Sequence, residues 1–201
     1  MFQVFNVGLA YSNTSVGVLA VVVGTVKIER SGRTFDAKTS DPISLQDKVT
    51  TLGKSRAQIL LLDQTAINLS QNAEIVIDKF LFGTEEDAVT LKISKGAFRF
   101  ISGKVATKSP ERVNVETPVA IIGVRGTEFI GQIAINESLV ALLNGKIEVA
   151  NDGYSQIVGV AGFGVSIDSA GVIAEPTKIP EDKLNSLINI LTRYIINYIF
   201  Y

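Results

Sequence analysis

Cysteine and histidine are both absent from the 201 residues of this chain. The sequence therefore excludes disulfides, thiolate nucleophiles, Ser-His-Asp triads, and zinc or iron sites that depend on sulfur or imidazole ligands. Oxygen ligands would still suit calcium, but the acidic segment at residues 83–87 lacks the ligand spacing of a calcium loop and is predicted to be a charged hairpin tip. We predict a protein that is not an enzyme and that uses no metal or cofactor.

An excess of either charge is also missing. The chain has 19 lysines and arginines against 20 aspartates and glutamates, for a net charge of -1. This balance gives no electrostatic reason to favour a polyanion or an anionic membrane as a partner. We therefore expect no nucleic-acid partner.

Long hydrophobic runs are missing as well. The apolar stretch at residues 16–26 is too short to cross a bilayer, which takes about 20 residues as a helix, so no transmembrane span is expected. No lysine or arginine precedes Lys27, and the basic region of a signal peptide is therefore missing. The chain either is not exported as written or has lost a leader.

Short alternating apolar runs, separated by turn dipeptides, fill most of the sequence. Lys95-Gly96 separates two such runs, and Asn144-Gly145 is the clearest turn signal because both residues tolerate the positive φ of a two-residue type I′ turn. Regular short strands without intervening helical patterns predict an all-β fold. We expect an antiparallel sandwich or roll, or a solenoid-like β domain.

The C-terminus alone has a helical pattern. From Pro180 to the end of the chain, apolar residues recur at helical spacing, among them Leu187, Leu191, Ile195 and Tyr198. This predicts a C-terminal amphipathic α-helix. Docking of the helix on the chain's own sheet is favoured over its binding to another subunit or to a membrane surface.

The segment TPVAIIGVRGTEF, residues 117–129, carries a family resemblance. It resembles the signature of the FecR-like domain, a β-rich module of bacterial envelope proteins, and residues 20–150 resemble the domain more loosely in order and spacing. Leu52 and Gln64 depart from the usual pattern at two turns. The resemblance implies a non-enzymatic role, since family members include regulators that carry an iron-uptake signal across the inner membrane. It also implies a periplasmic, cell-envelope or extracellular location.

The signature also has a physical interpretation as a corner of the sheet. Glycines allow backbone conformations closed to other residues, and the planar guanidinium of Arg125 can bind carbonyls or the carboxylate of Glu128. We therefore predict that Arg125 clamps this corner, with Phe129 directed inward and Glu128 outward; the alternative is that Arg125 binds an anion or a partner. The predicted motif residues are Thr117, Pro118, Gly123, Arg125, Gly126, Thr127, Glu128 and Phe129.

These patterns divide the chain into four segments. We expect an N-terminal extended arm at residues 1–19, the FecR-like domain at 20–150, further strands at 151–179 and the helix at 180–201.

Two functions fit such an organisation. The first is a structural scaffold that self-associates, into a filament or an envelope assembly, through its apolar N-terminal strand and C-terminal helix. The second is an adaptor or regulator of the FecR signalling type that senses a ligand or partner. The sequence favours the first slightly, because apolar side chains are in surplus at both ends. The partner would be the chain itself or another envelope protein. The predicted assembly residues are Val18, Val21, Val23, Leu187, Leu191, Ile195 and Tyr198.

Overall fold

The computed structural model describes residues 14–192, and strands dominate them. This confirms the predicted all-β fold with a C-terminal helix. The strands are β1 (Ser15–Val23), β2 (Val26–Arg30), β3 (Arg33–Asp36), β4 (Pro42–Ser44), β5 (Lys48–Thr51), β6 (Arg56–Leu61), β7 (Ala66–Leu69), β8 (Glu74–Leu81), β9 (Ala88–Ile101), β10 (Val113–Glu116), β11 (Ile121–Ile133), β12 (Glu137–Ala150), β13 (Ser155–Val158), β14 (Phe163–Asp168) and β15 (Thr177–Lys178). The helices are α1 (Lys104–Lys108) and α2 (Glu181–Thr192), and a 3-10 turn, η1, occupies Pro110–Arg112.

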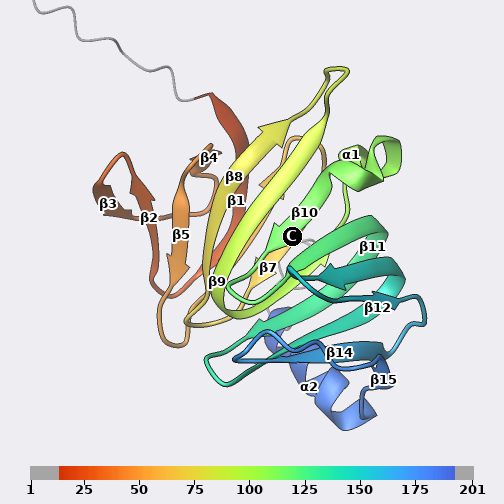
Figure 1. Ribbon diagram of the computed structural model, residues 1–201. Helices are drawn as coiled ribbons and strands as arrows, with labels where there is room; N and C mark the ends of the chain where they lie inside the picture. Colours follow the sequence, from red (N-terminus) through yellow and green to blue (C-terminus); the bar gives the residue numbers. More distant parts are fainter. Residues whose placement is uncertain (1–13, 193–201) are drawn as a thin grey trace, which may run out of the picture.

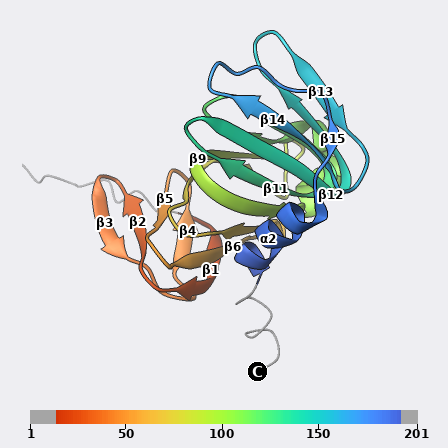
Figure 2. The same cartoon turned by 90° about the horizontal axis from the view of Figure 1, so that it is seen from below.

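All of these strands belong to one mixed sheet, and β9 lies at its centre. The first half of β9 pairs with β8 and β10, and its second half pairs with β7 and β11. The pairing of β10 with β9 is parallel, and β10 is antiparallel to β11. On one side of β9 the strand order continues from β11 through β12 and β14 to β15, and on the other side it continues from β7 through β6 and β1 to β4. Figures 1 and 2 show β1 and β4 on one side of β9 and β11, β12, β14 and β15 on the other.

The long strands bend at glycines, and two predicted turns are corrected there. Lys95-Gly96 lies inside β9 and Asn144-Gly145 inside β12, so neither dipeptide forms a hairpin turn. Both glycines have a positive φ, 91° for Gly96 and 84° for Gly145, but Asn144, for which the type I′ turn also required one, does not. The backbone bends without reversing because partner strands continue on both sides of each glycine. The positive φ of Gly145 was therefore predicted correctly, but the positive φ of Asn144 and the two hairpin turns were wrong.

A continuous apolar core lies between the faces of the bent sheet. Its largest fully buried side chains include three phenylalanines, Phe98, Phe100 and Phe129, which come from β9 and β11. The Phe129 ring meets Phe98 edge-to-face with centroids 5.7 Å apart, and its centroid lies 5.3 Å from that of Phe100. Gly131 provides room for this cluster, since a Cβ there would lie 2.2 Å from the Phe98 ring. The inward direction predicted for Phe129 agrees with this position.

Helix α2 packs on the chain's own sheet. Its apolar residues Leu187 and Leu191 are buried in a second cluster with Ile130, Leu139 and Ala141 of β11 and β12. Arg56 of β6 adds a hydrogen bond from Nε to the Ile190 carbonyl, at 2.7 Å. The helix lies beside the sheet in both views of the molecule (Figures 1 and 2). Docking within the chain, the arrangement favoured from the sequence, is the one observed.

The predicted assembly residues are largely used inside the fold. Val21 is buried in β1, which pairs with β6 along one edge and β4 along the other, and Leu187 and Leu191 are buried under α2. Val18 is partly exposed and Val23 half-buried. Ile195 and Tyr198 lie outside the described residues.

Candidate functional site

The signature segment runs through a corner in β11. Residues before the corner pair with the second half of β12, and residues after it pair with the first half of β12 and with β9. The register shifts between Arg125 and Glu128, and Gly126 has a φ of 61°. Gly145 of β12 fits against this bulge, because a Cβ at Gly145 would lie 2.3 Å from the Gly126 carbonyl oxygen. Two glycines on neighbouring strands thus make the bend.

Thr127 holds the corner together. Its hydroxyl donates to the Lys146 carbonyl at 2.8 Å and accepts from the Arg125 N–H at 3.1 Å. Its backbone N–H donates to the Ser102 hydroxyl at 2.7 Å, and its carbonyl accepts from both the N–H and the hydroxyl of Ser102. The side chain is almost entirely buried. One residue therefore joins β11 to β12 and to the end of β9.

Arg125 does not have the position expected of a clamp. Its side chain is exposed and makes no hydrogen bond or ion pair with the other residues of the range 14–192. Glu128 instead accepts from Arg99 of β9, whose Nε lies 2.8 Å from the carboxylate. The expected contact between Arg125 and Glu128 is corrected, because the bulge separates the two side chains and Arg99 lies on the adjacent strand.

We expect Thr127→Val to lower the free energy of unfolding by about 1–3 kcal/mol, because two partly buried hydrogen bonds to backbone groups are lost while the shape of the side chain is kept. Arg125→Ala, the matched control, should change it by about 0.5 kcal/mol or less. Urea denaturation of both variants measures the difference. An equal loss from Arg125→Ala would restore the arginine clamp.

The start of the signature borders a hollow on the surface. The Thr117 hydroxyl donates to the Ala120 carbonyl at 2.8 Å and accepts from the Ala120 N–H at 3.0 Å, which closes a tight turn around Pro118. This turn meets the β12–β13 turn and the segment after β14, and the three enclose about 350 Å³. The lining residues are Pro118, Val119, Asn151, Asp152, Gly153, Tyr154, Ser169, Ala170, Gly171 and Val172.

Exposed apolar groups gather around the hollow. Tyr154 is 66% exposed and Val172 55% exposed, and Ile157 of the adjoining strand β13 is 53% exposed. The walls are themselves held in place, since the Asn151 side-chain amide donates to the Gly171 carbonyl and its carbonyl oxygen accepts from the Tyr154 N–H. Large exposed apolar side chains on a fixed frame are typical of a surface that binds another protein.

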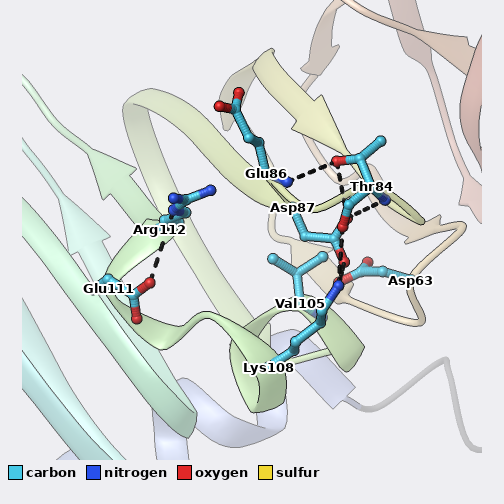
Figure 3. A network of polar contacts seen from close by, with 8 residues as sticks. All are labelled: Asp63, Thr84, Glu86, Asp87, Val105, Lys108, Glu111 and Arg112. Atoms are coloured by element: carbon cyan, nitrogen blue, oxygen red, sulfur yellow. Dashed lines mark hydrogen bonds and ion pairs between the residues drawn. The ribbon is translucent and has the colours of Figure 1, made fainter.

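A second polar cluster joins α1 to the β8–β9 hairpin (Figure 3). Asp87 is buried and accepts from the Thr84 N–H at 2.7 Å and from the Lys108 ammonium at 3.3 Å. The Thr84 N–H and then the Lys108 charge lower the pKa of Asp87 below its ordinary value of 3.8. At the other end of the helix, the Asp63 carboxylate accepts from the Val105 N–H. These groups are hydrogen-bonded to one another, so the cluster fixes α1 in place. The acidic segment connects the antiparallel strands β8 and β9, which confirms the predicted charged hairpin tip.

The fold and its surface define a class of protein. It is an all-β domain whose signature segment forms a corner of the sheet and whose surface carries, among its hollows, one that is rimmed by exposed apolar side chains. The family model described as "FecR protein" matches residues 47–148, and the chain belongs to this family. The match includes the corner from Gly123 to Phe129, so the resemblance inferred from the sequence is confirmed.

Solved structures share the fold. Two crystal structures of a "putative anti-sigma factor" from Parabacteroides distasonis ATCC 8503, at 1.65 Å and 2.50 Å, each match with a TM-score of 0.59 and 15% sequence identity. The match covers 71% of this chain and 64% of that one, so the chain corresponds to less than two thirds of that protein. No curated protein sequence matches the chain.

The prediction of a self-assembling scaffold was wrong. Membership of the FecR family points to regulation, the alternative that the sequence left open. The scaffold prediction relied on surplus apolar residues at the two ends, and the described ones among them pack largely within the chain. Within residues 14–192, no helix is both long and apolar enough to cross a membrane.

Proposed function

We propose that this chain is a sensing and adaptor module of a FecR-type signalling regulator, which acts by binding a partner protein rather than by catalysis. The observation that carries the proposal is the family match over residues 47–148. The fold shared with the Parabacteroides distasonis protein agrees with a regulatory role. The absence of cysteine and histidine supports a function based on binding.

The binding surface that we assign to this function is the hollow beside the Thr117–Pro118 turn. Its rim carries Tyr154, the kind of aromatic anchor that dominates binding energy when a partner covers it, and the exposed Val172 adds apolar area. By the same family argument, the working location is the cell envelope.

The expected result of deleting the gene in the organism that carries it is a change in a restricted set of transcripts. Restoring the wild-type chain should reverse this change, whereas a chain with Tyr154→Ala and Val172→Ser should not. Both side chains are largely exposed, so their replacement should leave the fold intact. RNA sequencing measures the transcripts, and immunoblotting checks that each chain is present at the same level.

Leu62→Ser is the matched control, because Leu62 is 59% exposed and does not line the hollow. A chain with this substitution should restore the transcripts fully. Envelope damage without any selective change in transcripts would contradict the signalling role. Full restoration of the transcripts by the Tyr154 and Val172 variant would show that the hollow is not the binding surface.

A further inference from the structure

The free edges of the sheet are not alike. Four of the described strands have only one neighbour, namely β3, β4, β13 and β15. Proteins usually protect such edges with charges, proline or extreme shortness, since unpaired backbone groups attract other strands. Strand β3 carries Arg33 and Asp36, β4 contains Pro42, and β15 has two residues, one of which is Lys178.

Strand β13 lacks these charges and prolines. It has four residues, Ser155–Val158, and it lies in a stretch, residues 153–167, without a single charged side chain or proline. Shortness is therefore its one protection. Figure 2 shows β13 beside β14 at the margin of the sheet.

The backbone groups of β13 that point outward follow from its register. The Asn151 N–H donates to the Tyr154 carbonyl at 2.9 Å and closes the β12–β13 hairpin. Because hydrogen-bonded pairs alternate along an antiparallel ladder, Gln156 is the next residue that bonds to β12. Ser155 and Ile157 consequently direct their N–H and C=O groups away from β12.

The adjacent edge shows how the chain covers such groups. Strand β14 pairs with the same side of β12 as β13 does, further along the strand. The segment after β14 folds back as an extended chain along the outer edge of β14: the Asp168 N–H donates to the Val172 carbonyl, the Ala174 N–H donates to the Ser166 carbonyl, and Thr177 pairs with Gly164. No described segment does this for β13.

We propose that the outer edge of β13 binds an extended, uncharged segment of a partner protein as an additional strand. Outward donors and acceptors spaced two residues apart match another extended main chain and not a helix. The inference rests on the proposed function, and it specifies the kind of partner segment that the signalling module recognises.

The side chains around the edge define the chemistry of that segment. Exposed Ile157 needs a β-branched or aromatic residue opposite it, and β13 itself has no charged side chain to pair with a lysine or a glutamate. The carboxylate beside it, Glu148 of β12, already accepts from the Ser155 hydroxyl at 2.9 Å. One end of the added strand lies at Tyr154, on the rim of the hollow, where a bulky apolar residue can enter. The partner segment is therefore a short run of alternating β-branched or aromatic residues without charges.

The test uses the full 201-residue chain and a phage-displayed library of random 12-residue peptides as the probe. Selected peptides should be extended and uncharged, with alternating β-branched or aromatic residues. Each is then synthesised with single N-methyl groups along its length. Binding should fall at least tenfold when the methylated residues are alternate ones, those that face β13, and should change little at the residues between them. Hydrogen exchange should slow at the Ser155 and Ile157 amides when peptide is added.

Ile157→Pro removes an outward N–H without removing a bond to β12, so the hairpin should persist while peptide binding is lost. Gln156→Pro is the contrasting variant, because it breaks the ladder itself and should destabilise the hairpin. Selected peptides that are helical or charged, or binding that N-methylation does not affect, would overturn the proposal. Self-association of the chain that Ile157→Pro abolishes would also overturn it, since the edge would then pair with a second copy.

The peptide assay tests the strand-addition inference and the transcript assay tests the signalling role, so a negative result in one does not decide the other. If no peptide binds the edge but deletion of the gene still changes selected transcripts, the strand-addition inference is wrong and the signalling role stands. If neither the deletion nor the Tyr154 and Val172 variant affects transcripts, the proposed function is wrong whatever the peptides do.

Discussion

Replacement of Phe129 by alanine is expected to lower the free energy of unfolding by about 3–5 kcal/mol, more than the other substitutions considered for the signature segment. The ring is fully buried and contacts both Phe98 and Phe100, so its removal leaves a cavity between β9 and β11 in addition to the lost apolar burial. Urea denaturation followed by circular dichroism measures the loss.

Phe82→Ala is the matched control. Phe82 follows β8, is 38% exposed, and has one aromatic neighbour, Phe80, with centroids 6.3 Å apart. Its replacement should cost about 1 kcal/mol or less. A loss below about 2 kcal/mol for Phe129→Ala would show that the core refills the cavity and that the three rings are not the anchor of the two halves of the sheet.

The inward position of Phe129 could be predicted because it depends on a local pattern. Side chains alternate along a strand, and once Gly126 is taken as the corner, alternation directs Phe129 to the core. The existence of helix α2 and its apolar face were predictable for the same reason, since both follow from the local spacing of its apolar residues. That the face packs on the chain's own sheet was the favoured of two alternatives. The strand content and the family signature likewise come from short stretches of sequence.

The partners of Arg125 and Glu128 could not be predicted in the same way. Glu128 meets Arg99, which lies 29 residues earlier in the chain, through the pairing of β11 with β9. That pairing depends on how the long strands bend, and the bend at Gly96 resembles a hairpin turn when it is read locally. A positive φ is required in either case, so the dipeptide alone does not distinguish a bend from a reversal.

The parallel pairing of β10 with β9 was also beyond the sequence. It needs a crossover, which α1 and η1 provide between Lys104 and Arg112. Five helical residues carry too little periodicity to be recognised, and the side chains that fix α1, Asp63 and Asp87, lie on distant turns. The free edge of β13 could not be predicted from the sequence either, because only the complete strand order shows which strands lack a second neighbour.

Asp47→Ala is expected to lower the free energy of unfolding by about 2–4 kcal/mol. The Asp47 carboxylate is fully buried and accepts from Arg30 through Nε at 2.7 Å and Nη2 at 2.6 Å, and from the Ser44 N–H at 2.8 Å. The hydrogen bond to Asp47 raises the pKa of Arg30. Removal of the carboxylate leaves the partly buried guanidinium without its counter-charge, with the Pro42 carbonyl as its remaining acceptor, and leaves the buried Ser44 N–H without its acceptor.

The surface pair between Lys27 and Asp36 provides the control. Its atoms are as close, at 2.8 Å, but Asp36 is 73% exposed, so Asp36→Ala should cost about 1 kcal/mol or less because water replaces the lost contact. Urea denaturation of both variants gives the comparison, and equal losses would mean that burial adds nothing to the Asp47 pair.

A double variant, Arg30→Met with Asp47→Leu, should recover most of the stability, since it leaves no charge without a partner. Asp47, the first residue of the FecR match, joins β2 to the turn between β4 and β5. Because this connection is lost in Asp47→Ala, the β2–β3 ribbon should unfold at a lower urea concentration than the corner at Gly126.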